Sequence, residues 1–222
     1  MMNLNLPPSA VLSGKEWTWI GTSYFIGCFT AGYYWTRWKT GQDIRHLGSG
    51  NVGARNVGRV LGYWGFTITF LLDFLKGAVA VAGAQKLVLS PTATVLTIAA
   101  VVAGHIWPIQ LRGLGGKGIA ASLGALLAYD PILVLCQIVV FVPVIAILRS
   151  LTLSGMVAFA VGPLVAFLCG LENVEVVAAS AVAILILMSH RKNIREEITG
   201  FAQPSRLKES TIEMHKGPPD EV

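Results

Sequence analysis

Three short segments combine glycine with basic and hydrogen-bonding side chains, and they are where this 222-residue chain could do chemistry. They run from Gly48 to Arg59, from Gly104 to Gly118 and from Ser189 to Arg195. Glycine has no Cβ and lets backbone N–H groups close on a ligand, while Arg and Lys supply positive charge. This combination is typical of phosphate binding, often at the N-terminus of a helix. Because it occurs three times, we interpret the segments as parts of one site rather than as loops that only fix the topology.

Helix starts are expected beside the first two segments. Lys117 precedes a helix predicted to open after Gly118, and Ser49 and Asn51 precede one predicted to begin near Asn56. Both arrangements would direct backbone N–H groups and polar side chains at an anion.

Two histidines are expected at one depth, since His105 and His190 each lie near the end of an apolar run that leads into a basic segment. We interpret them as members of a shared site. They could donate hydrogen bonds to phosphate or carbonyl oxygens, or move protons.

Asp73 and Lys76 lie three residues apart on one face of a predicted membrane helix. Ionisable groups at membrane depth are costly and normally pair or face a polar cavity. Two interpretations stay open at this point. The residues form a structural ion pair, or Lys76 lies at the floor of the site and attracts an anionic substrate.

The elements that must position these residues are membrane helices. Apolar residues make up 54% of the chain and charged residues 13%, about half the charge of a soluble domain. We therefore predict an all-α, polytopic membrane protein with about seven transmembrane helices, although a re-entrant fourth segment would lower the count. The predicted spans are about Trp17 to Trp35, Leu61 to Lys86, Ala93 to Leu111, a short one ending near Asp130, Ile132 to Leu148, Ser154 to Leu171 and Val174 to His190.

The basic residues indicate the orientation of these spans. Of the 17 Lys and Arg residues, 14 fall on one side, Lys15 and Lys86 on the other, and Lys76 within a span. Cytoplasmic loops carry the excess of Lys and Arg, so we predict an external N-terminus and a cytoplasmic C-terminus. The net charge is +5, but the basic residues lie between the apolar runs and not along one helix face, which argues against a nucleic-acid partner. Residues 1–198 are expected to form one transmembrane catalytic domain, and residues 199–222 a polar, disordered tail.

In order and spacing, these segments resemble the signature of the bacterial acyl-phosphate:glycerol-3-phosphate acyltransferases, the PlsY family. Its first motif is matched from Gly48 to Arg59, and its DFLKG element from Asp73 to Gly77. The second motif is matched by Gly104 to Pro108 with Gly115 to Gly118, and the third by His190 to Ile194.

Two positions depart from that pattern or leave it open. Arg55 stands where members commonly carry Thr, so a large cation replaces a hydroxyl. A small polar residue that members carry between the fifth and sixth spans has two candidates here, Thr152 and Ser154.

The resemblance implies transfer of a fatty acyl group from acyl-phosphate to the 1-hydroxyl of glycerol 3-phosphate, giving lysophosphatidic acid and phosphate. It places the enzyme in the bacterial inner membrane with its site facing the cytoplasm. The two substrates and membrane lipids are the expected partners; no cofactor, metal or obligate protein partner is expected. The residues expected to act in the chemistry are Ser49, His105, His190 and Asn193. Those expected to bind substrate are Gly50, Asn51, Gly53, Asn56, Arg59, Lys76, Gly115, Gly116, Lys117 and Ser154.

An acyl phosphate is already a mixed anhydride, so we predict direct attack by the glycerol hydroxyl without a covalent enzyme intermediate. The substrate phosphate dianion would accept the proton. The main alternative function, a transporter or channel for a phosphorylated solute, needs a polar path through the bilayer. Only Asp73 and Lys76 are expected to lie deep, which favours the enzyme.

Overall fold

The computed structural model describes residues 11–191, and every regular element among them is a helix. Contacts divide the chain into two compact units, Met1–Ser189 and His190–Val222, and the ten helices found within residues 11–191 lie in the first. The predicted boundary at residue 198 falls outside the described residues. The helices are α1 (Gly14–Cys28), α2 (Ala31–Thr40), η2 (Ile44–His46), α3 (Ala54–Lys86), α4 (Pro91–Ile106), η3 (Ile109–Leu111), α5 (Ile119–Tyr129), α6 (Pro131–Leu148), α7 (Leu151–Leu168) and α8 (Asn173–Ser189).

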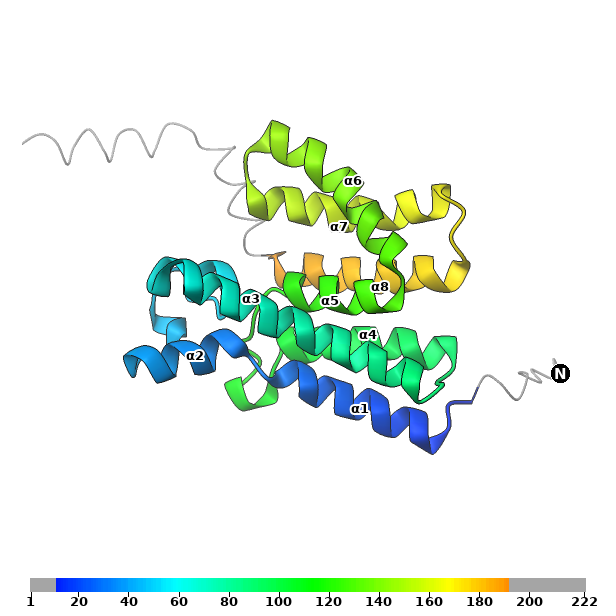
Figure 1. The fold of residues 1–222 in the computed structure, drawn as a ribbon, viewed down its shortest axis with the longest axis horizontal. Coiled ribbons are helices and arrows are strands. Elements are labelled where there is room, and N and C mark those ends of the chain that lie inside the picture. Colours follow the sequence, from blue (N-terminus) through cyan, green and yellow to red (C-terminus); the bar gives the residue numbers. More distant parts are fainter. Residues whose placement is uncertain (1–10, 192–222) are drawn as a thin grey trace, which may run out of the picture. The chain divides into compact units, whose positions relative to one another are not determined.

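Helices α3 to α8 run back and forth, so the connections of the first unit gather at two ends (Figure 1). The α2–α3 and α4–α5 connections, which carry two of the three candidate segments, lie at the same end. Four stretches are long and apolar enough to cross a membrane: Ala54–Lys86, Pro91–Leu111, Pro131–Leu148 and Leu151–Leu168. Helices α5 and α8 are shorter apolar helices. For the part of the chain that the structure describes, the prediction of an all-helical fold with helices able to span a membrane is confirmed.

The first predicted span is wrong as a continuous helix from Trp17 to Trp35. Helix α1 ends at Cys28, Phe29 and Thr30 are extended, and α2 begins at Ala31. The break has a physical cause elsewhere in the fold. The side chain of Lys76 donates hydrogen bonds to the carbonyls of Gly27 and Phe29, and that of Gln110 donates to the carbonyl of Cys28. Those carbonyls would otherwise lack partners at membrane depth.

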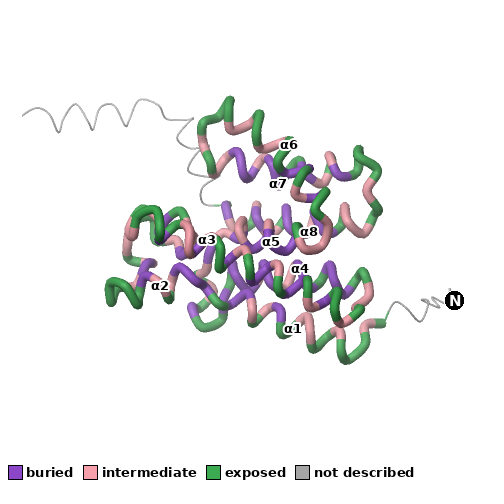
Figure 2. The backbone as a smooth tube through the Cα atoms, viewed as in Figure 1, coloured by how far each residue is buried: buried purple, intermediate pink, exposed green. Residues whose placement is uncertain are grey.

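Close helix packing depends on glycines that face backbone. A Cβ on Gly27 of α1 would lie 2.1 Å from the carbonyl oxygen of Val101, and one on Gly104 of α4 would lie 2.1 Å from that of Tyr24. A second pair, Gly77 and Gly124, brings α3 and α5 together in the same way. Small residues allow such approaches between membrane helices. The buried positions in Figure 2 accordingly concentrate where these helices face one another.

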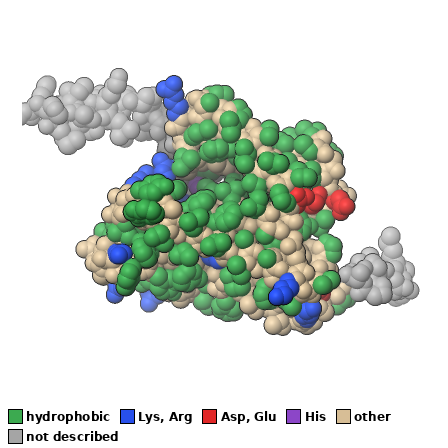
Figure 3. Space-filling view, in the orientation of Figure 1, with side chains coloured by type: hydrophobic (Ala, Val, Ile, Leu, Met, Phe, Trp, Pro, Cys, Tyr) green, Lys and Arg blue, Asp and Glu red, His purple; other side chains and the backbone are tan. Residues whose placement is uncertain are grey.

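Helix α6 is the least buried of the long helices. Only Leu133, Cys136 and Gln137 of its eighteen residues are buried, and the exposed remainder is almost wholly apolar. An apolar surface of this kind suits contact with lipid. In Figure 3 hydrophobic side chains are spread over the visible face, and the main group of acidic side chains lies towards the end where α7 connects to α8.

At the end away from the candidate segments, Glu16 ties the start of α1 to the start of α4. Its carboxylate accepts hydrogen bonds from the Ser90 hydroxyl at 2.5 Å and the Ser90 backbone N–H at 3.0 Å. It also accepts from the backbone N–H of Ser13, completing a capping box. The hydrogen bond from the Ser90 hydroxyl is the largest cause that lowers the pKa of Glu16 to about 2.

We expect Glu16→Gln to lower the melting temperature by a few degrees at neutral pH and to reduce its dependence on pH. The folded-state pKa of Glu16 lies below its ordinary value, so its stabilisation is present above about pH 4.5 and is lost as the pH falls towards 2. Thermal unfolding of both proteins in detergent across this range measures the effect. The other carboxylates are common to both, so identical pH dependence would contradict the prediction.

Candidate functional site

Asn56 holds the first glycine-rich segment in shape. Its side-chain oxygen accepts from the backbone N–H of Ser49 at 2.8 Å. Its amide nitrogen donates to the carbonyls of Leu47 and Asn51, each at 2.9 Å. Asn56 is buried and fully engaged, whereas the side chain of Ser49 is exposed. Positive φ angles at residues 48 and 50 require glycine there.

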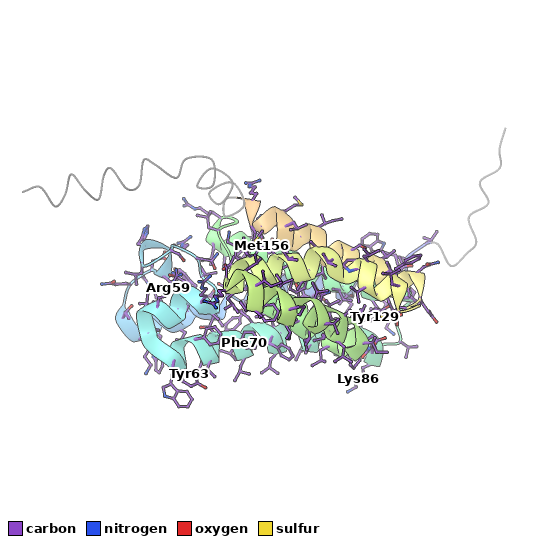
Figure 4. The ribbon with its side chains drawn as sticks, turned by 90° about the horizontal axis from the view of Figure 1, so that it is seen from above. Arg59, Tyr63, Phe70, Lys86, Tyr129 and Met156 are labelled. Carbon is purple, nitrogen blue, oxygen red and sulfur yellow. The ribbon has the colours of Figure 1, made fainter. Side chains whose placement is uncertain are left out.

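The same segment leads into the N-terminus of α3. The side-chain oxygen of Asn51 accepts from the backbone N–H of Gly53, the residue that precedes the helix, at 2.7 Å. Arg55 and Arg59 lie one turn apart at the start of α3, and both are exposed. In Figure 4, Arg59 lies towards the same end of the first unit as Met156 of α7, away from Lys86. Two exposed cations at the N-terminus of a helix make this helix start suitable for an anion.

The second segment folds back on the end of α4 because two glycines leave room. The backbone N–H groups of Gly115 and Gly116 donate to the carbonyls of Ile106 and His105, at 3.1 and 3.0 Å. A Cβ on Gly115 would lie 2.2 Å from the His105 carbonyl oxygen, and one on Gly116 would lie 2.0 Å from His105 Nε2. Gly118, with φ +89°, then directly precedes α5. These contacts give a physical reason for glycine at both positions.

Lys117 joins the second segment to the end of α8. Its ammonium donates to the Ser189 carbonyl at 2.7 Å, and the Ser189 hydroxyl donates to the Lys117 carbonyl at 2.9 Å. A cation at the C-terminus of a helix also interacts favourably with the helix dipole. The structure therefore brings the first residue of the third segment to the second.

A small apolar core brings the first two segments together. It contains Ile44, Val52 and Val57 from the first region and Leu111 from the second. The two predicted segments thus meet, as the sequence indicates.

Arg45 reinforces this junction, although it is not among the site residues predicted from the sequence. Its guanidinium pairs with Asp43 at 2.6 Å, donates to the Leu111 carbonyl at 3.3 Å and lies over the Tyr33 ring. The hydrogen bonds from Arg45 hold the pKa of Asp43 below its ordinary value. The signal available in the sequence was the Asp-x-Arg spacing, in which Asp43 caps the short η2 turn.

Arg55 contacts one of the two candidates between the fifth and sixth predicted spans. Its guanidinium donates a hydrogen bond to the Thr152 hydroxyl at the start of α7. Ser154, by contrast, is completely buried, and its hydroxyl has no hydrogen-bond partner within residues 11–191. The large cation at position 55 therefore links the first segment to α7 through Thr152.

A buried polar cluster lies behind the segments. The Lys76 ammonium lies 2.9 Å from Asp73 Oδ1 and 2.7 Å from His105 Nδ1. It also donates to the carbonyls of Gly27 and Phe29, at 3.0 and 2.6 Å. The ion pair considered from the sequence is present, and His105 Nδ1 contacts its ammonium.

Two predicted site residues are not part of the first compact unit. His190 begins the second compact unit, and Asn193 falls outside the described residues. The geometry of the site is therefore that of the first unit alone.

Comparisons with known proteins agree on one family. A family model described as glycerol-3-phosphate acyltransferase matches residues 17–200. Glycerol-3-phosphate acyltransferase 1 of Desulfitobacterium hafniense is 42% identical over 184 residues, which cover 83% of this chain and 91% of the relative. The enzyme of the same name from Bacillus anthracis is 37% identical over 177 residues, covering 80% and 94%.

Two solved structures are similar over nearly the whole described fold. Both are crystal structures of PlsY (YgiH), an integral membrane glycerol 3-phosphate acyltransferase. The glycerol 3-phosphate form has a TM-score of 0.76 and 33% identity, covering 84% of this chain and 94% of that one. The lysophosphatidic acid form has a TM-score of 0.74 and 31% identity, covering 84% and 93%.

Proposed function

We propose a mechanism from the premise that this chain belongs to the glycerol-3-phosphate acyltransferase family. The chain is an integral membrane acyltransferase of phospholipid synthesis that acylates glycerol 3-phosphate to lysophosphatidic acid. Its acyl donor is an acyl phosphate, so both substrates present a phosphate. The observation that carries this proposal is the packing of two phosphate-type segments around one core of Ile44, Val52, Val57 and Leu111.

The reaction needs positioning more than it needs a nucleophile on the protein. The 1-hydroxyl oxygen of glycerol 3-phosphate attacks the acyl carbonyl carbon, and the bond from that carbon to the phosphate oxygen breaks. The leaving phosphate keeps the electron pair, and the phosphate of glycerol 3-phosphate accepts the hydroxyl proton. Holding the two substrates in reacting geometry supplies much of the acceleration in such a step.

The polar residues of the first two segments that are exposed or half-buried are suited to hold the phosphates. We assign Ser49 and Arg59, with the N-terminus of α3, to one phosphate and Lys117 to the other. For the third segment, the sequence predicts that His190 and Asn193 act in the chemistry. Asn56 and the glycines keep the loops in the shapes that direct these groups, as their hydrogen bonds and close contacts indicate. Arg55 adds a cation at the rim and fixes Thr152.

We further propose seven passes through a bacterial inner membrane, with the broken pair α1–α2 as the first. The N-terminus is outside, the C-terminus is cytoplasmic, and the site faces the cytoplasm. The division of 14 basic residues against two supports this orientation. Residues 1–198 act as one catalytic domain, with lipids and the two substrates as partners.

Purified protein in lipid vesicles tests the donor. Acyl phosphate and glycerol 3-phosphate should give lysophosphatidic acid and phosphate in equal amounts, whereas acyl thioesters should give neither. Ser49→Ala and Lys117→Met should lower kcat/KM by about 10²-fold, since each removes a charge or donor from a positioned phosphate.

Lys86→Met is the matched control for the loss of a cation, because Lys86 lies at the other end of α3. It should keep wild-type kinetics. Product formed from thioesters but not from acyl phosphate would overturn the proposed donor. Passage of glycerol 3-phosphate into vesicles without any product would favour a transporter.

A further inference from the structure

We propose that Lys76 is a positioning residue that holds the two glycine-rich segments in register and does not itself contact substrate. The inference rests on the proposed function, because it concerns the same site. It changes the part expected for Lys76 and His105, which the sequence assigned to substrate binding and to the chemistry.

Burial separates Lys76 from any substrate. Asp73, Lys76 and His105 are 1%, 6% and 3% exposed. The ammonium has three protons and four potential acceptors within 3.0 Å: Asp73 Oδ1, two backbone carbonyls and His105 Nδ1. A charge that is already surrounded in this way has no donor left for a phosphate.

One set of contacts leads from Lys76 to the first segment. Its hydrogen bonds to Gly27 and Phe29 stabilise the break between α1 and α2. Gln110 takes the remaining carbonyl, that of Cys28. Because the helix breaks there, α2 can lie against the first segment, where a Cβ on Gly32 would be only 2.0 Å from the Val52 carbonyl oxygen. Lys76 thus fixes the helix that supports this segment.

The other contact leads to the second segment. His105 Nδ1 lies 3.5 Å from Asp73 Oδ1, too far for a good hydrogen bond, but 2.7 Å from the Lys76 ammonium. Since an ammonium can only donate, Nδ1 accepts and the ring proton is on Nε2. The Nε2 edge of the ring lies directly against Gly116, next to Lys117. Lys76 therefore sets the ring on which the second segment rests.

An ion pair kept for stability alone would be a weaker explanation. Buried ion pairs often contribute little net stability, because desolvation offsets the attraction. Asp73 alone would also be enough to pair Lys76. Lys76 also contacts the α1–α2 break and His105, and these contacts connect it to both segments. We call Asp73, Lys76 and His105 the joint between the two segments.

The decisive comparison is between the wild type and the double variant Asp73→Asn/Lys76→Met. The double variant removes the ammonium and leaves no buried charge unpaired. Spin labels at His46→Cys, just before the first segment, and at Leu114→Cys, within the second, report the distance between the segments; both positions are exposed. Cys169, which is exposed, is replaced by Ser in all proteins; Cys28 and Cys136 are buried. We expect a broader distance distribution and, without labels, a fall of about 10²-fold in kcat/KM for both substrates.

Thr69→Val controls for a change in buried polarity, since Thr69 is buried one turn before Asp73 and lies outside the joint. It should leave both readouts unchanged. If the double variant does not fold, His105→Leu removes only the contact to the second segment and should broaden the same distribution. A narrow, wild-type distribution with kcat/KM within about threefold in the double variant would overturn the proposal. The distance measurement needs no turnover, so it judges this inference even if the acyl-phosphate donor proves wrong.

Discussion

Gly116→Ala should lower kcat/KM by about 10²-fold or more while the protein remains folded. The new Cβ would lie 2.0 Å from His105 Nε2, and His105 is held behind by the Lys76 ammonium. The ring cannot retreat without breaking that contact, so the segment must move outwards. Lys117, the next residue, would then be displaced from the phosphate that we assign to it. Initial rates against both substrates, with thermal unfolding in parallel, measure the effect.

This variant tests space and not backbone strain, because Gly116 is not among the glycines with positive φ. Gly155→Ala is the matched control. It lies on α7 beside Ser154, and its Cβ would meet only Ile119 Cδ1, at an ordinary 3.6 Å. Wild-type kinetics for Gly116→Ala would show that the second segment need not lie where His105 holds it.

Much of the helical framework could be predicted because a membrane span corresponds to a continuous apolar run in the local sequence. The apolar runs of α6 and α7 match helices Pro131–Leu148 and Leu151–Leu168 to within a few residues. The start of α3 was also close: a helix expected near Asn56 begins at Ala54. Apolar length and glycine-rich ends are enough to locate such elements.

The break in the first span could not be predicted in this way. Phe29 and Thr30 carry no helix-breaking signal, and neither Gly nor Pro stands at these two positions. The cause is distant in the chain, since Lys76 follows Phe29 by 47 residues and Gln110 follows Cys28 by 82. A contact over that separation is a property of the folded chain, and the local sequence does not reveal it.

For the site, too, one part could be predicted from local residue types and another part could not. Glycine, Arg and Lys correctly marked the first two segments as neighbours, and the core of Val52, Val57 and Leu111 explains why these two meet. Residue types could not tell which polar side chains face outwards and which hold the loops. Asn56 and Ser49 look equivalent in the sequence, yet Asn56 is buried and bonded to backbone while Ser49 is exposed.

The largest loss of stability is expected from Gly27→Ala. The added Cβ would lie 2.1 Å from the Val101 carbonyl oxygen and 3.1 Å from the Cα of Gly104, and both are backbone atoms that cannot rotate away. Helices α1 and α4 would have to separate, which weakens their packing along the whole contact seen in Figure 1. Overpacking of this kind costs about 1–3 kcal/mol, and the backbone contact places this variant at the upper end. Thermal unfolding in detergent should show a clear drop in melting temperature.

Gly21→Ala provides a control in the same helix. A Cβ on Gly21 meets nothing within 4 Å, so the substitution should be neutral or stabilise α1 by up to about 1 kcal/mol through helix propensity. In Gly27→Ala, the separation of α1 from α4 should also weaken the hydrogen bond that the Tyr24 hydroxyl donates to the Trp107 carbonyl, 2.8 Å long in the native fold. Equal melting temperatures for the two variants would mean that α1 and α4 do not pack through Gly27. The position of the α1–α2 break, where Lys76 donates its hydrogen bonds, would then not be fixed by that packing.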